Sequence, residues 1–119
     1  MKDYGYFRRE EMACKCGCGL VKSQPRLIFK LNLLRDYIGH PLRVNSWTRC
    51  TVHNASVGGK VTSSHLLGWS CDIDTPTRYL ADKILLFVGQ IGFRGIGMGE
   101  NFIHLDDDPA KAPDRFWYY

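Results

Sequence analysis

SSHLLGWSCDID, residues 63–74, is the stretch that decides the fold. It ends in a short strand candidate, Cys71–Asp74, in which apolar and acidic residues alternate as they do on a half-buried strand. His65 precedes this strand and Asp72 lies near its start. The stretch therefore carries two side chains with metal-binding chemistry to the entrance of a sheet.

Further strand candidates lie on both sides of this stretch, at Leu42–Trp47, Gly95–Met98 and Phe102–Asp106. Thr48–Ser64 is rich in Gly, Ser, Thr and Asn, and we expect it to form a long irregular loop. A loop of that length in a compact domain is more often functional than idle.

Two amphipathic helices are predicted as well. In the first, Ser23 is a candidate N-cap, Pro25 lies near the first turn, and apolar residues recur at helical spacing up to the terminating Gly39. The second is expected to begin at Thr75–Pro76 and to end before Gly92. The sequence thus predicts an α+β fold, with a small antiparallel sheet, two main helices packed against it and a metal cleft on the sheet.

Length and charge limit the classes of function. The 119 residues suffice for one domain, 1–119, and no apolar run approaches the roughly 20 residues that span a bilayer. The net charge of +4 suits an anionic polymer, but no run of Lys or Arg marks a nucleic-acid surface. We therefore expect a monomer with no nucleic-acid partner and no membrane insertion. The start, MKDYGYFRREEMACKC, has no apolar signal segment and no small-residue cleavage site, so we expect no signal peptide and synthesis in a cytoplasm.

Five cysteines are present: Cys14, Cys16, Cys18, Cys50 and Cys71. Their odd number and the lack of a signal peptide argue against a disulfide framework. The alternating thiols of CKCGC fit the usual C-x2-C spacing of structural zinc sites poorly. This pattern favours a tight Gly-rich turn with small, partly buried thiols. A metal-dependent nucleic-acid binder built on CKCGC remains a weaker alternative.

His65, Asp72 and His104 form the main candidate constellation. A catalytic zinc ion takes three protein ligands with nitrogen or oxygen donors and leaves a fourth position for water. From spacing alone, a hydrogen-bonded structural pair is the more common explanation for such residues. The other two histidines, His40 and His53, are expected to be turn and loop residues.

The wider strings around these residues resemble the zinc D-alanyl-D-alanine carboxypeptidases and related phage and bacterial peptidoglycan peptidases. More distant relatives of that family are the vancomycin-resistance dipeptidases and the hedgehog domain. The family pattern Ser-x-His, Gly-x-Ala-x-Asp and a later strand His is met by Ser63–His65, Gly68–Asp72 and His104, with Ser70 in place of Ala. The upstream Arg and Asn and the Gly-Gly pair match as Arg49, Asn54, Gly58 and Gly59, and EEMACKCGCGL and Arg115–Tyr118 are similar to the short phage-type branch.

This resemblance implies specific roles. His65, Asp72 and His104 would be the zinc ligands, Arg49 would hold a substrate carboxylate or the developing oxyanion, and Ser63 would position substrate or His65. The implied activity is hydrolysis of stem peptides or cross-links of peptidoglycan, as a D-Ala-D-Ala carboxypeptidase or an L-Ala-D-Glu endopeptidase. The implied setting is a phage lysin, made in the host bacterial cytoplasm and acting at the cell wall after release.

The general base departs from the family pattern. Many relatives have Glu three residues before the last His, where this chain has Asn101. Asp106 lies two residues after His104, so both share one face of a strand at about 7 Å, whereas Glu100 is about 13 Å away. We prefer Asp106 to Glu100 as the proton acceptor. The alternative role of Asp106 is to orient a ligand histidine, and the alternative function of the chain is a non-catalytic wall-binding or virion structural module.

Overall fold

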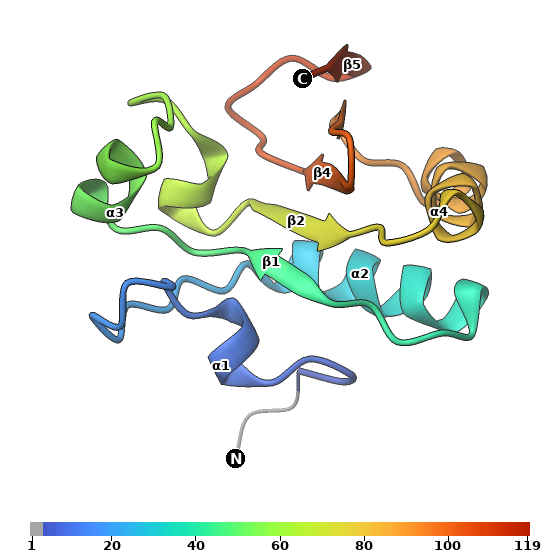
Figure 1. Ribbon diagram of the computed structural model, residues 1–119, viewed down its shortest axis with the longest axis horizontal. Helices are drawn as coiled ribbons and strands as arrows, with labels where there is room; N and C mark the ends of the chain where they lie inside the picture. Colours follow the sequence, from blue (N-terminus) through green and yellow to red (C-terminus); the bar gives the residue numbers. More distant parts are fainter. Residues whose placement is uncertain (1–3) are drawn as a thin grey trace.

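A sheet with the strand order β1-β2-β4-β3-β5 forms the centre of the structure, a computed structural model that describes residues 4–119 (Figure 1). The strands are β1 (Val44–Ser46), β2 (Ser70–Asp74), β3 (Gly95–Met98), β4 (Phe102–Asp106) and β5 (Arg115–Tyr118). β1, β2, β4 and β3 pair antiparallel, whereas β5 lies parallel to β3. The predicted α+β class is confirmed, with one parallel pair added to the expected antiparallel sheet.

The middle strands alternate between two environments. Ile103 and Leu105 of β4 are fully buried in the hydrophobic core, together with Cys71 and Ile73 of β2. The residues between them face the other side, as the period of two in a strand requires. Asp72 is the register partner of His104. Strand pairing therefore brings together two side chains that lie 32 positions apart in sequence.

Two long helices, α2 (Pro25–Ile38) and α4 (Arg78–Ile91), complete the core. Their apolar stripes pack against the buried face of β2 and β4, and the stacked rings of Tyr37 and Phe87, 5.3 Å apart, join the two helices. Both are predicted from the periodicity of the sequence. Among the described residues, no helix is sufficiently long and apolar to cross a membrane.

The starts of these helices differ from the prediction. The N-cap of α2 is Gln24 and not Ser23. The Gln24 side chain makes no capping bond and donates to the Leu67 carbonyl at 2.8 Å, while Pro25 at the first turn fixes the helical φ. α4 begins at Arg78, after Thr77, whose hydroxyl accepts a bond from the Leu80 amide. Thr75, the predicted start, lies before the helix, and its amide donates to the Asn101 carbonyl. Both ends are as predicted, since Gly39 and Gly92 have positive φ.

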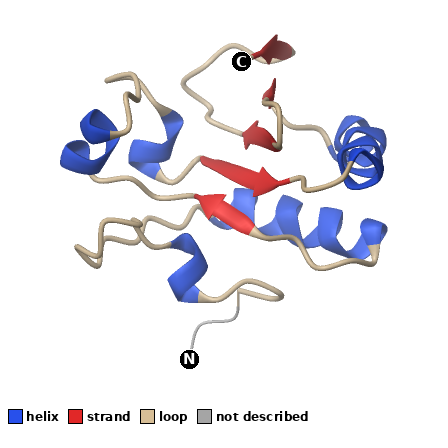
Figure 2. Ribbon diagram, viewed as in Figure 1, coloured by secondary structure: helices blue, strands red, loops and turns tan. Residues whose placement is uncertain are grey.

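The predicted irregular loop Thr48–Ser64 contains a helix, α3 (Thr51–Ser56) (Figure 2). The Cys50 thiol caps this helix by accepting a bond from the His53 amide. A 3-10 turn, η1 (Ser64–Leu67), follows and leads into β2, and a further short helix, α1 (Arg9–Met12), precedes the CKCGC turn. In Figure 1, α3 and η1 lie at the start of β2, and α4 lies beyond its end.

β5 was not predicted as a strand. It lies beside β3 because β3 has glycine at two positions: a Cβ on Gly97 would lie 2.6 Å from Trp117 Nε1, and one on Gly95 would lie 2.8 Å from Arg115 Nη2. The bare backbone of β3 thus lets two side chains of β5 lie across the sheet, next to β4. This arrangement places the end of the chain over the polar face of the sheet.

Candidate metal centre

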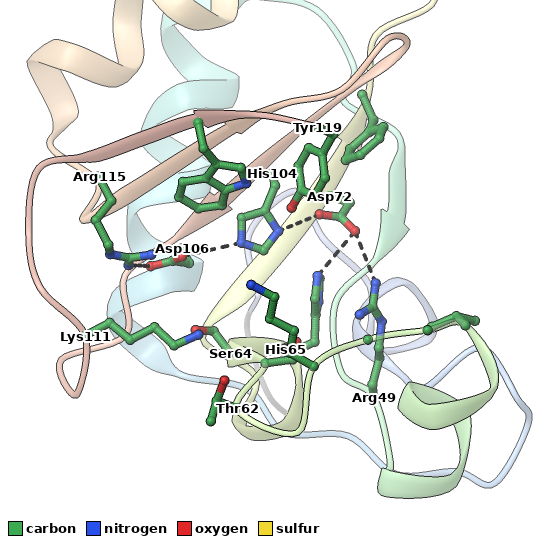
Figure 3. A pocket seen from close by; sticks show the side chains of 17 residues that line it. Arg49, Thr62, Ser64, His65, Asp72, His104, Asp106, Lys111, Arg115 and Tyr119 are labelled. Atoms are coloured by element: carbon green, nitrogen blue, oxygen red, sulfur yellow. Dashed lines mark hydrogen bonds and ion pairs between the residues drawn. The ribbon is translucent and has the colours of Figure 1, made fainter.

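His65, Asp72 and His104 converge on the polar face of the sheet, from η1, β2 and β4 (Figure 3). Each offers one ligand atom, and these atoms all lie within 4.8 Å of one another. Asp72 lies between the histidines, with Oδ2 3.2 Å from His65 Nε2 and Oδ1 2.8 Å from His104 Nδ1. The structure therefore brings together the three residues that the sequence singled out.

The ring of His65 is fixed by its backbone surroundings. Nδ1 lies 2.6 Å from the Trp47 carbonyl oxygen, so Nδ1–H donates and Nε2 presents its lone pair towards Asp72. The Ser63 hydroxyl accepts a bond from the His65 amide at 3.2 Å. η1 ends at Gly68 with φ +74, where a Cβ would lie 2.1 Å from the Lys22 carbonyl oxygen. Glycine is thus required at this position, and it sets the direction in which β2 begins.

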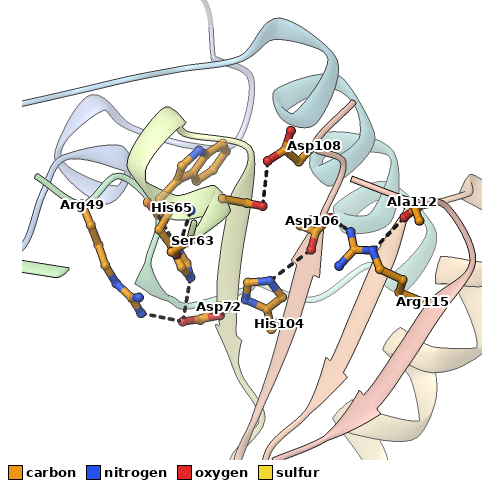
Figure 4. A network of polar contacts seen from close by, with 11 residues as sticks. Arg49, Ser63, His65, Asp72, His104, Asp106, Asp108, Ala112 and Arg115 are labelled. Carbon is orange, nitrogen blue, oxygen red and sulfur yellow. Dashed lines mark hydrogen bonds and ion pairs between the residues drawn. The ribbon is translucent and has the colours of Figure 1, made fainter. Parts of the chain in front are cut away.

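Asp106 lies on the far side of His104 (Figure 4). Its Oδ2 is 3.4 Å from His104 Nε2, and its Oδ1 accepts a 2.6 Å bond from Arg115 Nη2. The side chain is only 1% exposed. Asp72, His104, Asp106 and Arg115 thus form a continuous chain of polar contacts across β2, β4 and β5. The predicted shared face of His104 and Asp106 is present.

Arg49 approaches Asp72 from the opposite side. Its Nη2 lies 3.5 Å from Asp72 Oδ2. The guanidinium is also held by Ser46 Oγ and by Asn54 Oδ1, both at 3.3 Å. Two further donors of the fork are therefore already engaged, and Arg49 stands beside the triad with a fixed orientation.

Burial and charge shift the pKa values of these groups. Burial raises the pKa of Asp72 and of Asp106. Hydrogen bonds from His104 to both carboxylates, together with the contact of His65 with Asp72 and the bond from Arg115 to Asp106, outweigh burial and lower both pKa values. Burial lowers the pKa of His65, whereas the two carboxylates beside His104 overcome burial and raise its pKa. Both carboxylates are consequently ionised at neutral pH.

A cavity of about 750 Å³ opens onto the triad. Four cations line it, and its only carboxylates among the described residues are Asp72 and Asp106. The cations are Arg49, Lys60, Lys111 and Arg115. Phe102, Trp117 and Tyr119 supply aromatic walls. The cavity therefore suits an extended ligand that carries negative charge.

Several residues that line the triad cavity were not predicted from the sequence. Lys111 and Tyr119 reach the cavity from the segment around β5. The pairing of β5 with β3 cannot be predicted from a local sequence pattern. Ser64 is buried and donates to Asp108 Oδ2 at 2.9 Å, which ties η1 to the segment after β4. No pattern in the sequence pairs Ser64 with Asp108, which lies 44 positions away.

The other candidate residues from the sequence lie away from the triad. Glu100 and Asn101 line a second cavity beside α4, and Glu100 is exposed. His40 bonds the neighbouring Pro41 carbonyl, and His53 lies in α3. Asp106 is therefore the candidate acceptor that shares a cavity with the triad.

The residues of the triad fit a zinc ion. Two imidazole nitrogens and one carboxylate form a ligand set typical of catalytic zinc, and the cavity leaves room for water. The carbonyl bond on His65 Nδ1 and the carboxylate at His104 Nε2 are the second contacts that orient such ligands. A bound metal ion would replace the observed contacts of His65 and His104 with Asp72.

Comparison with known proteins agrees with this chemistry. No curated protein matches the chain. A family model described as Peptidase M15 matches residues 5–106, which include the triad, Arg49 and Asp106. This match covers most of the chain and confirms the resemblance found in the sequence, so the chain belongs to the Peptidase M15 family of zinc peptidases.

Proposed function

We propose that this protein is a zinc peptidase that hydrolyses stem peptides or cross-links of bacterial peptidoglycan. One observation carries the proposal: His65, Asp72 and His104 meet beneath a cation-lined cavity in a member of a peptidase family. Membership of the Peptidase M15 family supports a metallopeptidase that acts on substrates of this class. The cation-lined cavity supports the proposal that the substrates are peptidoglycan peptides.

In this proposal His65 Nε2, an Asp72 carboxylate oxygen and His104 Nδ1 hold the metal ion. When bound, zinc polarises the scissile carbonyl and lowers the pKa of a bound water towards ~7. The protein fixes the ligands in advance, because His65 is held by a backbone carbonyl and Asp72 and His104 lie opposite each other in a buried ladder. Such preorganisation limits the cost of assembling the site.

Arg49 is proposed to bind a substrate carboxylate or the oxyanion that develops during hydrolysis. Its guanidinium stands beside Asp72 and is aimed by Ser46 and Asn54. Removal of one preorganised stabiliser of an oxyanion costs about 10²–10³ in rate. Stem peptides carry free carboxylates, and Lys60, Lys111 and Arg115 extend the positive lining to further such groups.

Asp106 is proposed to accept the proton of the attacking water. Arg115 anchors its Oδ1, while Oδ2 lies beside His104 on the cavity side. The lowered pKa keeps the carboxylate ionised, but it also makes Asp106 a weak base. The same contact with His104 Nε2 would let Asp106 orient a zinc ligand. The two roles predict different kinetic results when Asp106 is replaced.

The test is digestion of purified peptidoglycan by the zinc-loaded protein, with fragments identified by mass spectrometry. We expect stem-peptide fragments to appear, to cease with a chelator and to return when zinc is restored. The masses would distinguish loss of a terminal D-Ala from cleavage between L-Ala and D-Glu. A fully metallated sample that releases no fragment would overturn the proposal. The setting that we propose, a phage lysin reaching the wall after release, rests on the likeness to the short phage-type branch.

A second candidate is a wall-binding or virion structural module that keeps the metal site without turnover. The position at which many relatives have a Glu is occupied here by Asn101, which lies outside the triad cavity. This candidate predicts that the zinc-loaded protein sediments with peptidoglycan and leaves it intact. The peptidase predicts release of fragments under the same conditions.

A further inference from the structure

Four cysteines gather at one point outside the triad cavity: Cys14, Cys16, Cys18 and Cys50. Their sulfur atoms all lie within 4.8 Å of one another, with 3.5 Å between Cys14 and Cys16 and 3.7 Å between Cys16 and Cys50. All are free thiols, and the fifth cysteine, Cys71, is buried in the hydrophobic core. The first three thiols come from the CKCGC turn and the fourth from the segment before α3.

The backbone explains how alternating cysteines share one point. On an extended strand, Cys14 and Cys18 would lie about 13 Å apart along the chain. Instead the chain turns back after α1, with Gly17 and Gly19 both at φ +85, a conformation that favours glycine. The Cys14 amide bonds the Leu20 carbonyl at 2.9 Å and closes the turn. The three side chains thereby point to the same side.

Cys50 is brought to this turn by a separate backbone bond. The Thr48 amide donates to the Met12 carbonyl at 3.1 Å, which holds the segment after β1 against the end of α1. The alternating spacing of Cys14, Cys16 and Cys18 favoured a plain Gly-rich turn over a zinc site, because it departs from the usual C-x2-C spacing. The fourth ligand lies far along the chain from Cys18, at a separation that carries no spacing signal.

The sulfur spacing suits a tetrahedral zinc ion. Zn–S bonds of about 2.3 Å place the sulfurs of a site with four cysteine ligands roughly 3.8 Å apart. The closest pairs are already at 3.5 and 3.7 Å, and the whole cluster lies within 4.8 Å. Small side-chain rotations would bring the four sulfurs to the spacing of a closed structural site. Soft thiolate ligands of this kind select zinc over Mg²⁺ or Ca²⁺.

Backbone amides support the sulfurs from outside. The Cys50 amide donates to Cys14 Sγ at 3.4 Å, and the His53 amide donates to Cys50 Sγ at 3.3 Å. Amide donors disperse the negative charge of thiolates, and such outer contacts are a regular part of metal sites. A chance meeting of thiols would not require them.

We propose that Cys14, Cys16, Cys18 and Cys50 bind a second zinc ion, with a structural role. This ion would join the turn after α1 to the segment that begins at Thr48. Arg49 lies in that segment, directly before Cys50, so the second ion would also hold the backbone from which Arg49 reaches Asp72. The proposal does not depend on peptidase activity, because its ligands and its test are separate from the triad.

The test is the zinc content of the reduced protein, measured after reconstitution with zinc alone and removal of free metal. The wild type should hold one zinc more per chain than Cys16→Ser or Cys18→Ser, whose exposed side chains can be replaced without disturbing the core. Cys71→Ala is the matched control, a cysteine outside the cluster, and should retain the second ion. His65→Ala should lose the triad zinc and keep the cysteine-bound zinc.

Cobalt substitution of the wild type gives a reading that needs no variant. Co²⁺ in the cluster should produce the strong thiolate charge-transfer absorption and the intense visible bands of a tetrahedral site, and should protect the cluster thiols from alkylation. The proposal is overturned if His65→Ala holds no zinc, or if the thiols of the metal-loaded wild type remain fully reactive. Formation of a disulfide within the cluster in the presence of zinc would overturn it as well.

Discussion

Asp106 contacts a proposed zinc ligand and a cation at once, and its replacement separates the two roles that this position allows. If Asp106 accepts the proton, Asp106→Asn should lower kcat by roughly 10²–10⁴ while KM and zinc content change little. If it only orients His104, zinc affinity should fall by about 10–100-fold. Steady-state kinetics on a stem peptide and competition with a zinc chelator measure both quantities.

The control for this variant is Asp114→Asn. Asp114 is exposed and has φ 60, a conformation that Asn also tolerates. This control should leave both kcat and zinc affinity unchanged. Full activity of Asp106→Asn at saturating zinc would remove Asp106 from proton transfer.

Ser70, close to the triad, has a buried Oγ with no hydrogen-bond partner among the described residues. It lies opposite Asp106 in the ladder, where the family pattern has Ala. An unsatisfied buried hydroxyl costs about 1–3 kcal/mol, so Ser70→Ala should leave the free energy of unfolding unchanged or raise it. Urea denaturation measures this difference.

Ser64→Ala is the matched comparison for Ser70→Ala. Ser64 is buried too, but it donates to Asp108 Oδ2 at 2.9 Å. Its loss deprives a buried carboxylate of a donor and should lower the free energy of unfolding by about 1–3 kcal/mol. If Ser70→Ala destabilises the protein as much as Ser64→Ala, the Ser70 hydroxyl has a partner in solution.

At the scale of elements, Gly59 controls the position of Arg49. A Cβ on Gly59 would lie 2.0 Å from Asn54 Oδ1, the atom that accepts a bond from Arg49 Nη1. Gly59→Ala should therefore displace Asn54 and release Arg49. We expect KM to rise and kcat to fall, by up to the ~10²–10³ of a lost oxyanion stabiliser, with zinc still bound.

Gly89→Ala is the corresponding control glycine. Gly89 lies in α4 with nothing within 4 Å of a Cβ. Replacement should raise the free energy of unfolding by about 0.5–1 kcal/mol and leave kinetics unchanged. Kinetics of Gly59→Ala equal to those of Gly89→Ala would show that Arg49 is not positioned through Asn54.

The elements also show what sequence patterns can and cannot predict. The alternation of FIHLD placed Ile103 and Leu105 in the core and His104 on the polar face, because a strand has one simple period. α3 was missed because its short run of polar and small residues carries no helical period and is held by the Cys50 cap. β5 was missed because its position depends on Gly95 and Gly97 of a distant strand.

In the metal centre, too, local motifs were predictable and long-range contacts were not. Identities and motifs pointed to His65, Asp72, His104 and Arg49, which converge as expected. The Arg115–Asp106 bond and the entry of Lys111 and Tyr119 into the cavity depend on how β5 packs across the sheet. Such long-range contacts leave no local pattern.

For the whole molecule, the triad links three segments of the chain, so zinc should stabilise the fold. A ligand that binds only the folded state adds about 2.7 kcal/mol at a concentration roughly 100 times its Kd. The Tm should rise on addition of zinc and fall with a chelator. The zinc effect should weaken in acid, because protonation of His65 and His104 competes with the metal. Calorimetry at several pH values measures this, and a Tm indifferent to zinc would contradict metal binding in the folded state.

The most direct test of the account compares Asp72→Asn with Asp74→Asn. Both carboxylates lie on β2, but Asp72 belongs to the triad and Asp74 lies outside the cavity. Zinc content and release of peptide fragments from peptidoglycan are measured on the same preparations. We predict that Asp72→Asn loses one zinc per chain and all release, while Asp74→Asn keeps both. Undiminished zinc and release in Asp72→Asn would contradict the account.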